Sequence, residues 1–98
     1  MTMAATQTVS GALTFDTVPV LYRTSDSWFA GDNEIVIDLA QVTRADSAGL
    51  ALMVEWLRRA QAVGRRLRFA NIPAQMQTLI RVNGVQDALL DGNSQIGR

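Results

Sequence analysis

The chain of 98 residues contains no cysteine, no histidine and no lysine. The absence of cysteine excludes disulfides and thiolate metal sites, and the absence of histidine removes the commonest general base and the commonest transition-metal ligand. A glycine-rich phosphate loop needs a lysine, so intrinsic nucleotide hydrolysis is excluded as well. We therefore expect no catalytic residues, no metal site and no cofactor, and we predict that the protein is not an enzyme.

Long apolar runs and an excess of one charge are also lacking. No stretch approaches the roughly 18 to 20 consecutive apolar residues that a bilayer-spanning helix needs, and residues 1–10 have neither the positive charge nor the apolar block of a secretory signal. Nine basic and nine acidic side chains cancel, so the electrostatic footprint of a nucleic-acid binder is missing. We expect a cytoplasmic protein that binds no nucleic acid and does not insert directly into a membrane.

The apolar pattern that is present is typical of one α/β domain. In chain order, the expected elements are a strand or hairpin at Val9–Phe15, a helix beginning at Thr17, a central strand at Ile35–Leu39, a helix at Ser47–Val63, a strand at Leu67–Ala70 and a helix that follows Pro73. Strands that alternate with helices imply right-handed crossovers onto a parallel portion of a sheet. We predict a mixed sheet of four to five strands with helices packed against it. The single domain is expected at residues 8–90, between a flexible N-terminus at 1–7 and a flexible C-terminal tail at 91–98.

The long helix at Ser47–Val63 has two apolar arcs. One arc of about 120°, expected to pack on the sheet, contains Leu50, Met53, Val54, Leu57, Ala60 and Gln61. The second arc lies roughly 120° to 140° away and contains Leu52, Trp56 and Val63. Either a neighbouring helix of the same chain covers the second arc or another protein does. The first and third helices are both available as neighbours, which favours coverage within the chain. Arg58 and Arg59 nearby strengthen the interface alternative, since Trp and Arg anchor interfaces more often than other residues.

The start of the same helix carries Asp46, Ser47, Ala48 and Gly49. In a structural interpretation, Asp46 or Ser47 caps the free amide groups of the helix, which contributes about 1 kcal/mol. In a functional interpretation, the first turn is a contact or switch point where small Ala48 and Gly49 allow a partner to approach closely. A phosphate on Ser47 would place up to about two negative charges in an apolar interface and would then act as a release signal.

The segment from Ile35 to Leu57 resembles the central strand and second helix of STAS domains. The family includes anti-sigma-factor antagonists, transporter tails and the small subunit of the Mla phospholipid-transport ABC system. The residues that carry the resemblance are Asp38-Leu39, Val42 and Asp46-Ser47-x-Gly49-Leu50, and a looser similarity extends from about Val9 to Leu90. Within the family, Val42-Thr43-Arg44 and the run from Gly49 to Met53 are most similar to the Mla subunit, usually called MlaB.

The resemblance implies a STAS-like fold and two alternative roles. The MlaB-like branch implies a cytoplasmic subunit held at the inner face of the inner membrane by its partner, an MlaF-like ATPase in a complex with a membrane permease. It would support the assembly and activity of that ATPase in phospholipid traffic that maintains outer-membrane lipid asymmetry. The antagonist branch implies a partner-switching regulator that binds an anti-sigma factor or a kinase and is controlled by phosphorylation of Ser47.

Both branches direct attention to the start of the long helix. The predicted partner interface consists of Ser47, Ala48, Ala51, Leu52, Glu55, Trp56 and Arg59, and the helix-start motif consists of Asp46, Ser47 and Gly49. A third class, a lipid or small-molecule binder, would need an apolar pocket between the sheet and the helices. It is disfavoured because no polar residues converge to orient a ligand.

Overall fold

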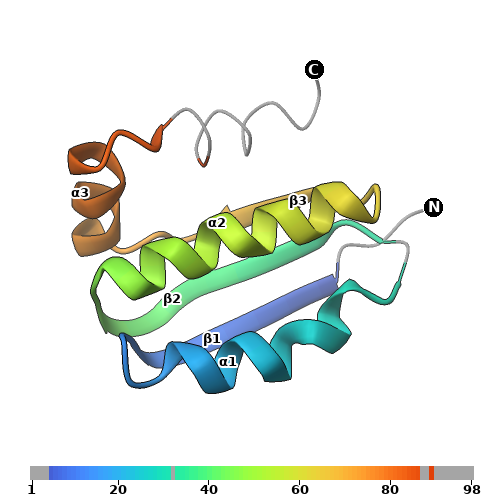
Figure 1. Ribbon diagram of the computed structural model, residues 1–98, viewed down its shortest axis with the longest axis horizontal. Coiled ribbons are helices and arrows are strands. Elements are labelled where there is room, and N and C mark those ends of the chain that lie inside the picture. The colour runs from blue at the N-terminus through green and yellow to red at the C-terminus, as the bar shows by residue number, and fades with distance from the viewer. Residues whose placement is uncertain (1–4, 32, 87–88, 90–98) are drawn as a thin grey trace.

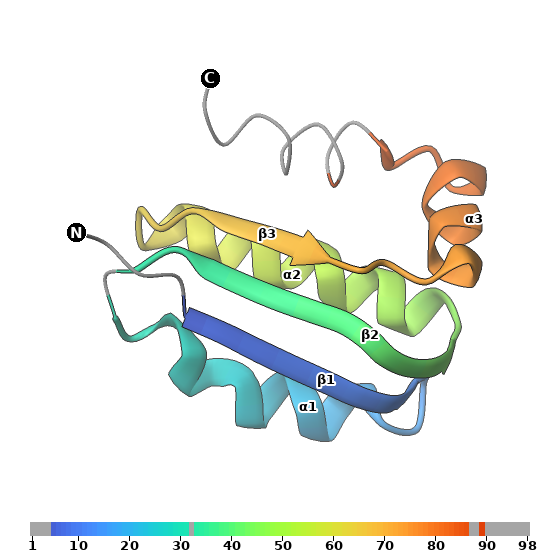
Figure 2. The same cartoon turned by 180° about the vertical axis from the view of Figure 1, so that it is seen from behind.

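Three parallel strands form the sheet of this protein in the order β1-β2-β3, in a computed structural model that describes residues 5–31, 33–86 and 89. The strands are β1 (Ala5–Leu13), β2 (Ile35–Ala45) and β3 (Leu67–Ala70). The helices are α1 (Val18–Thr24), which continues as the 3₁₀ helix η1 (Ser25–Phe29), α2 (Ser47–Ala62) and α3 (Ala74–Val82). Figures 1 and 2 show α1 and α2 side by side on one face of the sheet, with α3 beyond the end of the sheet at which α2 begins.

The predicted α/β fold with parallel crossovers is confirmed, but the sheet is smaller than expected. The described residues form three strands rather than four to five, and all three run parallel instead of forming a mixed sheet. The hairpin alternative at Val9–Phe15 is wrong, because β1 is a single strand that ends at Leu13. Its pairing with β2 is irregular on both sides of Gly11, where the register of the paired residues shifts. β1 begins at Ala5, inside the segment assigned to a flexible N-terminus, and the predicted tail at 91–98 lies outside the described residues.

The core lies between β2 and α2. β2 pairs with both other strands, and its inward side chains Ile35, Ile37 and Leu39 are fully buried. From α2, Met53 and Ala60 of the first predicted arc are buried to the same extent. The prediction for this arc is only partly correct, because Leu50 is buried as well but Val54 and Leu57 are half-buried and Gln61 is exposed.

The second arc of α2 is also buried, by the chain's own α1–η1 segment. Trp56 is fully buried, and its indole N–H donates a hydrogen bond of 2.9 Å to the hydroxyl oxygen of Ser25 in η1. Its ring centroid lies 5.5 Å from that of Trp28 and 6.4 Å from that of Phe69. Of the two alternatives for this arc, the intramolecular one is therefore correct, and only Val63 at the helix end stays half exposed.

Candidate partner-binding site

The start of α2 is fixed by the carboxylate of Asp46. Oδ1 of Asp46 accepts a hydrogen bond from the backbone N–H of Ala48 at 2.9 Å, and Oδ2 accepts one from the backbone N–H of Phe15 at 3.1 Å. The backbone N–H of Asp46 donates to the carbonyl oxygen of Leu13 at 3.1 Å. Asp46 is therefore the helix cap, and it also attaches the β1–α1 loop to the first turn of α2.

These hydrogen bonds lower the pKa of Asp46 below its ordinary value of 3.8. The N–H of Phe15 has the largest effect, the N–H groups of Ala48 and Gly49 and the charge of Arg44 act in the same direction, and burial opposes them. Because the folded-state pKa is the lower one, the carboxylate stabilises the fold fully above the unfolded-state pKa. This stabilisation is lost as the pH falls through the folded-state value.

We expect Asp46→Asn to unfold at lower urea concentration than the wild type at neutral pH, because the charge-assisted bonds to Phe15 and Ala48 are weakened. The difference in free energy of unfolding should shrink as the pH falls below the ordinary pKa of 3.8 and through the lower folded-state pKa, where the wild-type carboxylate becomes protonated as well. Urea denaturation over a series of pH values measures this. Ser47→Ala is the control. It removes no carboxyl group, so its free energy of unfolding should differ from that of the wild type by an amount that does not change with pH. If the difference between Asp46→Asn and the wild type were also independent of pH, the assignment of the Asp46 carboxylate as the stabilising cap would be contradicted.

Gly49 packs against the chain's own β1 and not against a partner. It is buried, and a Cβ added to it would lie 2.7 Å from the carbonyl oxygen of Leu13 and 3.0 Å from the Leu13 Cβ. The missing side chain therefore allows α2 to pass close to the end of β1. The expectation that a partner uses the small size of Gly49 is wrong for this reason.

Four predicted interface residues do lie together on one side of α2, which we call the front face: Ser47, Ala48, Ala51 and Glu55. Ser47 and Ala51 are exposed, while Ala48 and Glu55 are half-buried. Glu55 is the only charged member, and its Oε1 lies 3.9 Å from Nη1 of Arg58. The structure thus presents a small, weakly polar surface at the start of the helix.

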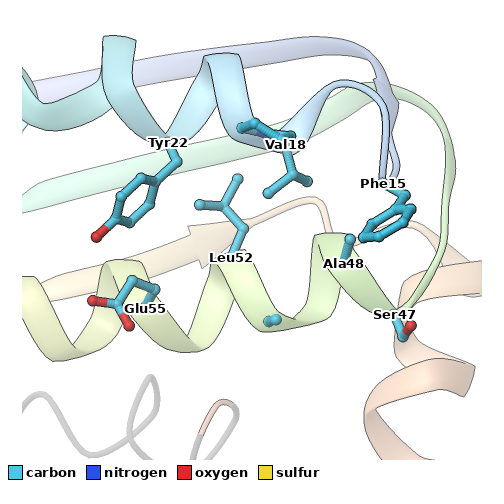
Figure 3. Close-up of a pocket in the computed structure, with 9 residues that line it drawn as sticks. Phe15, Val18, Tyr22, Ser47, Ala48, Leu52 and Glu55 are labelled. Carbon is cyan, nitrogen blue, oxygen red and sulfur yellow. The ribbon is translucent and has the colours of Figure 1, made fainter.

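A groove of about 600 Å³ runs between the front face and α1. Figure 3 shows Phe15, Val18 and Tyr22 on one side of it, facing Ala48, Leu52 and Glu55 of α2 on the other. Leu52 is only 2% exposed, so it contributes to the inner wall and not to a protruding contact. A second groove of about 450 Å³ lies on the other side of the front face, where α2 approaches the segment after α3.

Phe15 is the site residue that the sequence did not reveal. Its side chain is 81% exposed at the end of the groove beside Ala48 and Ser47 (Figure 3). The sequence placed it at the end of a strand or hairpin at Val9–Phe15, but β1 ends at Leu13 and the chain turns at Thr14, where the backbone N–H of Val18 donates a hydrogen bond to the Thr14 carbonyl oxygen. Burial of such a ring is worth roughly 1.5 to 3 kcal/mol, so its exposure marks a surface suited to a partner.

Trp56 and Arg59 do not belong to the front face. The expectation that Trp56 contacts a partner is wrong, because η1 and β3 enclose its ring completely. The Arg59 guanidinium lies 4.2 Å from the ring centroid of Tyr22, and its Nη1 lies 3.0 Å from Oδ1 of Asp26. Arg59 therefore holds Tyr22 and η1 against α2 and supports the wall of the groove.

The chain belongs to the STAS domain family, because residues 4–91 match the family model described as "Mlab, STAS domain". Proteins of this family typically act by binding and regulating other proteins rather than by catalysis. No curated protein shows significant sequence similarity to the chain.

Solved structures support the same fold. The chain is similar to a sulfate transporter family protein from Wolinella succinogenes, with a TM-score of 0.74 and 14% identity over 92% of this chain and 74% of that one. It is also similar to the anti-sigma factor antagonist SpoIIAA in its unphosphorylated form, with a TM-score of 0.61 and 20% identity over 80% of this chain and 73% of that one. A third likeness, to Mglu, has a TM-score of 0.61 and 26% identity over 74% of this chain, but the chain spans only 18% of Mglu.

Two further features of the described residues bear on function. Within residues 5–31, 33–86 and 89, no three His, Cys, Asp or Glu side chains come together as metal ligands would. None of the helices in that part of the chain combines the length and the apolar character needed to cross a membrane.

Proposed function

We propose that this chain is the non-catalytic STAS subunit of an Mla-type ABC phospholipid transporter. It binds the cytoplasmic ATPase subunit, which is MlaF-like, within a complex that includes a membrane permease. Through this contact it supports the assembly and activity of the ATPase in maintaining outer-membrane lipid asymmetry. The match of residues 4–91 to the Mlab family model supports the proposal, and the protein is then located at the inner face of the inner membrane through its partner.

The observation that carries the proposal is the exposed front face of α2 beside an exposed aromatic ring. Phe15 is 81% exposed, and its backbone N–H is held by the Asp46 carboxylate at the start of α2. A side chain whose loop is already fixed loses less conformational entropy when a partner covers it. Exposed Ala51, which lines the same groove, leaves room for the side chains of another protein. An ATPase that covers this surface would bury an aromatic side chain of a type that is enriched at protein interfaces.

The proposal is tested by co-purifying the chain with the ATPase of its transport system. The wild type is compared with two alanine-to-arginine variants. We expect Ala51→Arg to weaken binding of the ATPase at least about tenfold, because a long charged side chain on the front face prevents close packing. Ala62→Arg is the matched control, since Ala62 is exposed on the same helix eleven residues further on. It should bind like the wild type. Equal binding by both variants, with the wild type bound, would remove the front face from the interface.

Both variants should fold, because both positions are exposed and arginine is a good helix former. Leu52→Arg is unsuitable for this purpose. Leu52 is almost completely buried, so an arginine there would unfold the domain and binding would be lost for an unrelated reason.

A second function, partner switching controlled by phosphorylation of Ser47, is supported by the exposure of Ser47 on the first turn of α2 and by the likeness to SpoIIAA. The chain would then bind an anti-sigma factor or a kinase and be released when Ser47 gains a phosphate. Incubation with the candidate kinase and ATP, followed by intact-mass measurement, separates the two functions. A single phosphate that is lost in Ser47→Ala supports switching, whereas an unmodified chain that still binds the ATPase supports the transporter subunit.

A further inference from the structure

We propose that the groove between α1 and the first half of α2 receives an amphipathic helix of the partner, and that this helix carries a lysine or arginine that pairs with Glu55. The inference rests on the proposed function, because it specifies what the partner presents to the front face of α2. Three properties of the groove support it: the nature of its walls, its length and its charge.

The walls favour a helix over an extended segment. Both long sides of the groove are helices, α1 and α2, whose backbone N–H and C=O groups are bonded within each helix. An extended peptide needs the free edge of a strand for its own backbone groups, and no strand contributes to the lining that the described residues form. A helix satisfies its backbone internally, so it requires only side-chain contacts from the groove.

The length of the groove matches about two helical turns. Its α2 side runs from Ser47 to Glu55, which corresponds to about 12 Å along the helix axis. Figure 3 shows Phe15 and Ala48 at one end and Tyr22 and Glu55 at the other. A partner helix lying along the groove would place an apolar residue against Phe15 and the basic residue about seven positions away in its sequence.

The charge of the groove favours a cationic partner. Glu55 is the only charged side chain among the described residues that line it, and the remaining walls are mainly apolar. The ion pair between Glu55 and Arg58 is long at 3.9 Å, and the Arg58 side chain is 73% exposed, so this pair is weak and is easily exchanged for a partner's cation. A carboxylate at this position repels the negative head group of an anionic lipid, which argues against a lipid occupant.

The probes are two stapled helical peptides of about 15 residues. Each contains a leucine anchor, and they differ only at the position seven residues after it, which is lysine in one peptide and glutamate in the other. We expect the lysine peptide to bind the whole chain about tenfold more tightly than the glutamate peptide in fluorescence anisotropy. Glu55→Lys should reverse this order, because the charge in the groove is reversed. Gln61→Lys places a cation on the same helix outside the groove and should leave the order unchanged. Ala51→Arg should abolish binding of both peptides.

Equal affinities for the two peptides, or an order that Glu55→Lys leaves unchanged, would overturn the inference. Binding of neither peptide to a chain that binds the ATPase would also overturn it, while the proposed function would stand. Failure of the wild-type chain to bind the ATPase, with the peptide order observed as expected, would instead refute the transporter role and retain the helix-binding groove. The two failures are therefore distinguishable.

Discussion

Replacing Trp56 with alanine should lower the free energy of unfolding by about 3 to 5 kcal/mol. The indole is fully buried, packs on Trp28 and Phe69, and donates its N–H to the hydroxyl oxygen of Ser25. Its removal would leave a cavity between α2, η1 and β3 and would break the side-chain hydrogen bond from α2 to Ser25 of η1. Urea denaturation followed by far-ultraviolet circular dichroism measures the effect.

Trp56→Phe is the graded control. It keeps an aromatic ring in the core but removes the indole N–H, so it should destabilise the fold clearly less than the alanine variant does. The comparison also separates the two explanations of this tryptophan. If Trp56→Ala weakened partner binding but left the free energy of unfolding within about 0.5 kcal/mol of the wild type, the side chain would belong to an interface and the packing described above would be wrong.

Gly49→Ala should lower the free energy of unfolding by about 1 to 3 kcal/mol. The new methyl group would lie 2.7 Å from the carbonyl oxygen of Leu13, which belongs to the backbone and accepts the N–H of Asp46. α2 would have to move away from β1 to relieve this contact. Alanine in a helix interior is normally favoured over glycine by about 1 kcal/mol, so a net loss of stability identifies the close approach as its cause.

Gly31→Ala is the matched control for this substitution. A Cβ at Gly31 would have as its nearest neighbour the flexible side chain of Arg65, at 3.7 Å, which is ordinary van der Waals contact. Its free energy of unfolding should stay within about 0.5 kcal/mol of the wild-type value. Urea or thermal unfolding of Gly49→Ala and Gly31→Ala under the same conditions measures the difference. If the two variants had equal free energies of unfolding, the close approach of α2 to β1 at Gly49 would be contradicted.

The parts of the fold that the sequence predicted are those with a strong local pattern. The helix expected at Ser47–Val63 is observed at Ser47–Ala62, and the strand expected at Leu67–Ala70 has these bounds in the structure. The number of strands was not predictable in the same way. In the described residues only three segments pair as strands, and the weak alternation after Val9 was compatible with both a strand and a hairpin.

The candidate site was predictable only where it depends on neighbours in the chain. The cap at Asp46 and the exposure of Ser47 follow from their place at the start of a helix. The exposure of Phe15 and the burial of Trp56 do not, because each depends on a hydrogen bond between segments 31 residues apart: Phe15 with Asp46, and Trp56 with Ser25. Apolar periodicity identifies a second apolar arc on α2 but not the segment that covers it.

Thiol labelling tests the central claim, the availability of the front face of α2 to another protein, most directly. The chain has no cysteine, so Ala51→Cys introduces a single thiol on the front face, and Ala62→Cys introduces one further along the same helix. In the free chain both thiols should react rapidly with a maleimide, since both positions are exposed. We predict that saturating ATPase slows the reaction at position 51 by about tenfold or more and leaves position 62 unaffected. A thiol at position 51 that reacts as fast in the complex as in the free chain would contradict the account.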